Sequence, residues 1–111
     1  MAYDEELAER IRDHIDPGLD VTEQKMFGGL AFLIGGNMAV SAVRDGGLLV
    51  RVAPTEADRL LDDEFVTTMT MGSREMHGWL HVAPAALGDD TTLREWVDRG
   101  VHYARSLPTK K

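Results

Sequence analysis

The stretch Lys25–Asn37, KMFGGLAFLIGGN, decides the fold expected of this chain. Its apolar run ends in Gly35-Gly36-Asn37, which is typical of a tight turn, so the run is predicted to be a buried strand followed by a hairpin. The earlier pair Gly28-Gly29 interrupts the strand pattern. Glycine inside a strand usually marks a bulge, or a place where another backbone or a ligand comes close. We therefore expect one strand within residues 21–34, split or bulged at this pair.

Upstream of this stretch, apolar residues recur at helical spacing. Leu7, Ile11 and Ile15 share one helical face, which predicts an amphipathic helix over residues 4–15. Asp16-Pro17-Gly18 ends it, because proline disfavours helical geometry at the residue before it. Downstream, strands are expected over residues 38–44 and 48–53. The tight turn between these two strands predicts an antiparallel meander.

Capping signals predict two further helices. Thr55 with Asp58 forms a capping box, so a short helix is expected to begin at Thr55 with Pro54 outside it. The last helix is expected to begin at Thr92, with Glu95 completing its capping box.

Two more strands are expected between these helices, over residues 65–70 and 78–82, with a turn at Gly72-Ser73-Arg74-Glu75. The resulting order is α-β-β-β-α-β-β-α. It predicts an α+β two-layer sandwich in which an antiparallel sheet of about five strands carries its helices on one face.

Composition limits the class of protein. The 111 residues predict a single domain over 1–111, and the net charge of -7 disfavours direct binding to nucleic acid or to an anionic membrane. The chain has no cysteine, which excludes disulfides and zinc–sulfur sites. The acidic N-terminus lacks the features of a signal peptide, and no apolar run reaches membrane-spanning length, so we expect a cytoplasmic protein.

Strand alternation predicts that the second face of the sheet is partly apolar. Met38 is assigned to the face that the helices cover, and the residues assigned to the second face are Ala39, Val43, Leu49 and Trp79. His77 and His81 flank Trp79 on this face. An apolar face without a helix is expected to be covered, either by a second copy of the chain or by a loop or terminus of the same chain.

Residue types that carry catalysis do not converge. His77 and His81 would lie about 13 Å apart along a strand, too far to share a metal. Serines lack a nucleophile-elbow context, and the glycine pairs match neither a dinucleotide fingerprint nor a P-loop. The six methionines are more typical of core or interface than of a copper site. We therefore expect no catalytic residue, cofactor or metal.

The chain resembles the N-terminal domain of the TfoX/Sxy family over nearly its whole length. The matching segments are Tyr3-Asp4-Glu5-Glu6-Leu7, Lys25-Met26-Phe27-Gly28-Gly29, Gly36-Asn37-Met38, Leu48-Leu49-Val50-Arg51-Val52, Met76-His77-Gly78-Trp79, Trp96-Val97 and Tyr103-Ala104. The resemblance implies an α+β sandwich and a role in regulating competence through protein partners. Longer members carry a second, helical domain, so this chain is expected to be a stand-alone domain.

Two hypotheses follow from these patterns. The first is a non-enzymatic interaction module that forms a homodimer and acts in regulation through a protein partner. The alternative is a domain that binds a small ligand or anion near the Gly28-Gly29 bulge, where Lys25 and Arg51 would supply positive charge and freed backbone amides would receive the anion.

Overall fold

The computed structural model describes residues 5–15, 18, 21–26, 29–43, 46–61, 65–71 and 74–108, without the side chains of Met26, Met71, Arg74, Glu75 and His77. The elements in chain order are α1 (Glu5–His14), β1 (Val21–Met26), β2 (Gly29–Ile34), β3 (Asn37–Ala42), β4 (Leu48–Arg51), α2 (Pro54–Leu60), β5 (Val66–Met71), β6 (Arg74–Val82), the 3-10 helix η1 (Pro84–Leu87) and α3 (Asp90–Ser106). Among these residues, six strands form one antiparallel sheet in the order β1-β2-β3-β4-β6-β5.

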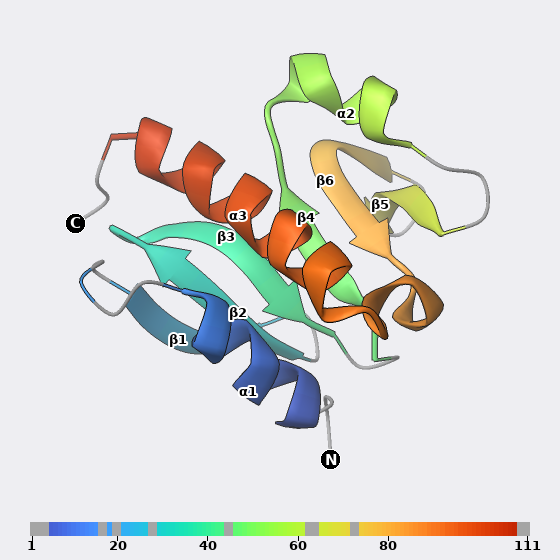
Figure 1. Ribbon diagram of the computed structural model, residues 1–111. Helices are drawn as coiled ribbons and strands as arrows, with labels where there is room; N and C mark the ends of the chain where they lie inside the picture. Colours follow the sequence, from blue (N-terminus) through green and yellow to red (C-terminus); the bar gives the residue numbers. More distant parts are fainter. Residues whose placement is uncertain are drawn as a thin grey trace.

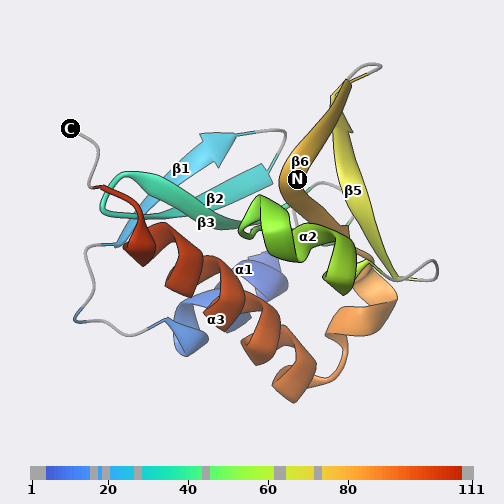
Figure 2. The same ribbon diagram turned by 90° about the horizontal axis from the view of Figure 1, so that it is seen from above.

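Helices α1 and α3 pack together over one face of the sheet, and α2 lies beside β6 (Figures 1 and 2). The core lies between these two layers, and its largest fully buried side chains include Ile11, Phe32, Leu48, Leu80 and Leu93. The opposite face of the sheet carries no helix from the described residues. The predicted α+β sandwich with helices on one face is therefore confirmed.

The predicted number of about five strands is wrong, because residues 21–34 form two strands. Val21 pairs with Ile34 and Met26 pairs with Gly29, so β1 and β2 are the two arms of an antiparallel hairpin. Phe27 and Gly28 connect them and lie outside the described residues. Gly29 is therefore the first residue of the second strand and not an interruption within a single strand.

Three glycines show why this part of the chain needs glycine. Gly35 and Gly36 have φ of 58° and 84° between the paired residues Ile34 and Asn37, which confirms the predicted hairpin. A Cβ on Gly29 would run into the carbonyl group of Ala42 on β3. Close approach of two backbones accounts for glycine at this position.

A bulge in β3 reverses two predicted side-chain directions. Phe32 pairs with Val40 and Leu33 pairs with Met38, so Ala39 is an extra residue opposite β2. Met38 consequently packs on the helix-free face and Ala39 packs in the core under the helices. Both assignments from simple alternation are wrong, since a bulge shifts the alternation by one residue.

Both predicted helix starts are also displaced. Helix α2 begins at Pro54, whose fixed φ suits the first helical position, and not at Thr55. Helix α3 begins at Asp90, because the Asp89 carboxylate accepts hydrogen bonds from the Thr91 amide and the Thr92 hydroxyl, each at 3.2 Å. The N-cap is therefore Asp89, three residues before the predicted start at Thr92.

Strand β6 is longer than predicted. It begins at Arg74, which pairs with Met71, so residues 74 and 75 belong to the strand and not to a turn. The remaining turn residues, 72 and 73, lie outside the described part of the chain.

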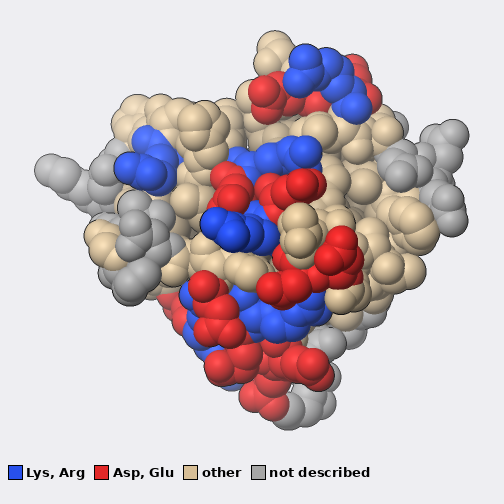
Figure 3. All heavy atoms as spheres, in the orientation of Figure 1, with Lys and Arg blue, Asp and Glu red and all other residues tan. Residues whose placement is uncertain are grey.

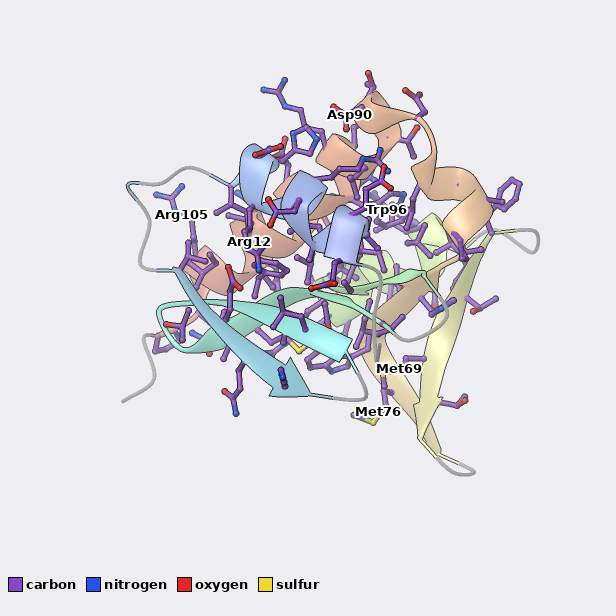
Figure 4. All side chains as sticks on the ribbon, turned by 90° about the horizontal axis from the view of Figure 1, so that it is seen from below. Arg12, Met69, Met76, Asp90, Trp96 and Arg105 are labelled. Carbon is purple, nitrogen blue, oxygen red and sulfur yellow. The ribbon has the colours of Figure 1, made fainter. Side chains whose placement is uncertain are left out.

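Ion pairs fix α1 against its neighbours. Arg12 donates two hydrogen bonds of 2.7 Å to the Glu23 carboxylate on β1, and these bonds lower the pKa of Glu23. At the start of α3, the Asp90 carboxylate accepts from His14 at 3.2 Å and from Arg10 at 3.3 Å (Figure 4). The hydrogen bond from His14 is the main cause of the lowered pKa of Asp90.

Candidate functional site

The helix-free face of the sheet carries a cluster of seven apolar side chains, here called the open-face cluster. Its buried members are Ala31, Met38 and Leu49, and its partly buried members are Leu33, Val43, Met69 and Trp79. The cluster draws on β2, β3, β4, β5 and β6 and on the residue after β3. It is separate from the core beneath the helices.

The sheet bends around this cluster because β6 is distorted. Thr68 pairs with Leu80 but Thr70 pairs with Glu75, so four residues of β6 lie opposite Met69 alone. Gly78, one of these four, has φ of 86°, and a Cβ there would lie 3.0 Å from the Val52 carbonyl oxygen. Figure 4 shows Met69 and Met76 on the side of the β5–β6 hairpin that faces β1 and β2. The apolar face is therefore concave.

The structure brings together three of the five residues predicted for an interface: Val43, Leu49 and Trp79 all belong to the open-face cluster. His81 pairs with Leu49 on β4 and with Thr67 on β5, and it is half-buried. His77 lies in β6, and its side chain is outside the described set.

Four members of the open-face cluster were not predicted: Ala31, Leu33, Met38 and Met69. Alternation within β2 and β5 carried the signal for Ala31, Leu33 and Met69, but those strands were not assigned to faces. Met38 was hidden by the bulge at Ala39.

The Arg51 guanidinium contacts two aromatic rings. Its guanidinium carbon is 5.1 Å from the centre of the Trp79 ring and 5.5 Å from that of Tyr103, distances typical of cation–π contact. The β3–β4 ladder ends at Val40 and Val50, so Arg51 lies beyond the last paired residues of β3. No described residue forms an ion pair or hydrogen bond with its side chain.

The residues predicted for an anion site are not brought together. Lys25 pairs with Leu30 and is exposed on the edge strand β1. Arg51 lies on β4, three strands away in the sheet order, and pairs with Trp79 of β6. That separation is about 14 Å from strand spacing alone. Gly29 is buried against Ala42. Met26 ends β1, and Phe27 and Gly28 lie outside the described residues.

A groove of about 700 Å³ separates α2 from α3. It is lined by Ala53, Glu56, Arg59, Leu60, Asp98, Arg99, His102, Tyr103 and Ser106. Charged side chains of both signs gather on α2 at the top of Figure 3 and on α3 in its centre. This groove was not predicted, because its two walls are far apart in the sequence.

Neither a metal cluster nor a membrane-spanning helix occurs in the described part of the chain. No three His, Asp or Glu side chains there are grouped to hold a metal ion. No helix there combines the length and apolar character needed to cross a membrane.

An open antiparallel sheet with helices on one face places the protein in the α+β class. Residues 13–104 match the family model of the TfoX N-terminal domain. The chain therefore belongs to the TfoX N-terminal domain family, as the sequence motifs indicated. No curated protein sequence and no solved structure matches the chain significantly.

Proposed function

We propose that this domain is a non-enzymatic, cytoplasmic interaction module that acts in regulation, of competence or related genes, by binding other proteins. Its first partner is a second copy of the chain, bound through the open-face cluster. Membership of the TfoX N-terminal domain family supports a regulatory role. The observation that carries the proposal is an apolar cluster on the face of the sheet without a helix.

The chemistry of this face favours a second copy as its occupant. The β1 residues that share the face are uncharged: Thr22 pairs with Leu33 and Gln24 pairs with Ala31. Two copies that each carry a net charge of -7 repel one another over most of their surfaces. A largely apolar face is where that repulsion opposes association least, and burying its partly exposed side chains, Leu33, Val43, Met69 and Trp79, would stabilise the contact.

The edge strand beside this face also favours self-association. Strand β5, VTTMTM, has no charged residue, whereas β1 at the other edge carries Glu23 and Lys25. Charged side chains protect an edge strand from pairing with another chain, and β5 lacks them. Antiparallel pairing of two β5 strands would extend the sheet and join the two open faces under one two-fold axis.

Light scattering after size exclusion tests the proposal. We expect the wild-type chain to have twice the chain mass, and Trp79→Asp to have the single mass, because a carboxylate cannot be buried at the contact without a partner. Leu33→Lys, on another strand of the same face, should also have the single chain mass. Arg105→Asp, exposed on α3, is the matched control and should remain dimeric. Far-UV circular dichroism checks that each variant is folded. A wild-type chain of single mass contradicts the proposal.

A further inference from the structure

We propose that the groove between α2 and α3 binds a small ligand that combines a phosphate or carboxylate group with a flat ring. This groove shares no lining residue with the open-face cluster. Its volume of about 700 Å³ falls within the range of small-molecule sites.

The lining of the groove divides into an apolar floor and a charged rim. Ala53, Leu60 and Tyr103 are half-buried, whereas Arg59 and Arg99 are exposed on opposite walls, from α2 and α3 respectively. A flat ring can lie on the floor against Tyr103, and the two guanidinium groups can reach its anionic substituent from both sides.

The arginines of the groove have no protein counter-ion among the described residues. Arg59 and Arg99 form no ion pair there, although acidic residues outnumber Lys and Arg by 19 to 12 in the chain. Two carboxylates also line the groove, Glu56 and Asp98, and Asp98 lies 4.0 Å from Arg94 instead. Both guanidinium groups are therefore available to bind the anionic group of a ligand. The negative charge of Glu56 limits the negative charge that a bound ligand can carry.

Arg51 contacts the ring of Tyr103, which forms part of the groove floor. It contacts Tyr103 at 5.5 Å without lining the groove itself, so it is a positioning residue for that ring. The chain has two tryptophans, and each reports on one arginine: Trp79 contacts Arg51, and Trp96 contacts Arg99 at 4.6 Å. Because Arg99 lines the groove, the fluorescence of Trp96 is the readout of binding there.

The test is a fluorescence titration at constant ionic strength with four probes. Phenyl phosphate and benzoate carry a ring and an anion, inorganic phosphate carries the anion alone, and phenol carries the ring alone. We expect phenyl phosphate or benzoate to give a saturable change with a dissociation constant of about 1 mM or tighter. Which of the two binds more tightly distinguishes a phosphate from a carboxylate ligand. Inorganic phosphate and phenol should each bind at least about tenfold more weakly, since each supplies only half of the contacts.

Variants assign the binding to the groove. Arg59→Gln and Arg99→Gln should each weaken it by about tenfold, because each removes one charge-assisted contact. Arg105→Gln, on the same helix but outside the groove, should leave it unchanged. No saturable change with either ring-bearing anion overturns the proposal. Binding that is unchanged in the Arg59→Gln/Arg99→Gln double variant, or equal affinity for inorganic phosphate, also overturns it.

Discussion

Gly100 of α3 lies directly against the carbonyl oxygen of Ala39 in β3. A Cβ on Gly100 would be 2.5 Å from that oxygen and 2.7 Å from Cγ1 of Val40. Ala39 occupies this position because the bulge in β3 turns it toward the helices. The bulge and the glycine are thus complementary: one displaces the strand and the other lets the helix meet it.

Gly100→Ala tests this contact. Alanine favours a helix over glycine by about 1 kcal/mol, but overpacking against backbone costs about 1–3 kcal/mol. We expect the strain to dominate and the free energy of unfolding to fall by about 1–2 kcal/mol, measured by urea denaturation. Gly88→Ala is the matched control, because its Cβ would meet no atom within 4 Å and its φ is -67°. It should be neutral or stabilising by up to about 1 kcal/mol. A stabilising Gly100→Ala would contradict the account.

Gly29→Ala should be more damaging than Gly100→Ala. The new methyl group would meet the Ala42 carbonyl across the β2–β3 ladder, where neither backbone can move without loss of hydrogen bonds. We expect a loss of about 3 kcal/mol in the free energy of unfolding, and a slope with urea that stays close to that of the wild type. A loss below that of Gly100→Ala would show that β2 can shift to accept the methyl group.

Acid should weaken the contact between α1 and α3. The hydrogen bond from His14, with a further one from Arg10, lowers the pKa of Asp90 in the folded protein below its ordinary value of 3.8. A carboxyl whose pKa is lower in the folded state stabilises the fold above its unfolded pKa, and this contribution is lost as the pH falls through the folded pKa. We expect the wild type to lose more stability than Asp90→Asn between about pH 5 and pH 3.

The control for the acid experiment is Asp98→Asn. Its carboxylate lies on the exposed surface, 4.0 Å from Arg94 within the same helix. Urea midpoints of this variant should follow the wild-type dependence on pH. Parallel curves for the wild type and Asp90→Asn would show that the contact with His14 and Arg10 is not maintained in solution.

Local patterns predicted the elements well, and failures occurred where distant parts of the chain decide the outcome. The hairpin at Gly35-Gly36 was predictable, because positive φ favours glycine locally. Alternation correctly placed Leu49 and Trp79 on the helix-free face, but it failed at Ala39, where a bulge depends on pairing with β2. The starts of α2 and α3 were misplaced because each region holds a competing start signal: Pro54 begins α2, and Asp89 caps α3.

Contacts between distant residues were beyond prediction from the sequence. The stacking of Arg51 on Tyr103 depends on how α3 crosses the end of β4, and no periodicity encodes that crossing. The groove between α2 and α3 has the same origin, since Arg59 and Arg99 come to line one groove only through tertiary packing. The candidate interface was predictable in part because strand alternation, a local property, determines which residues share a face.

The most direct test of the central proposal is a dilution series of amide NMR spectra, over about 1 mM to 20 µM. Chemical shifts should change with concentration for Leu33, Leu49, Met69 and Trp79, and stay constant for α1 and the exposed side of α3. This result would place self-association on the open face of the sheet. Spectra that do not depend on concentration together with a single chain mass by light scattering, or shift changes confined to α1 and α3, would contradict the account.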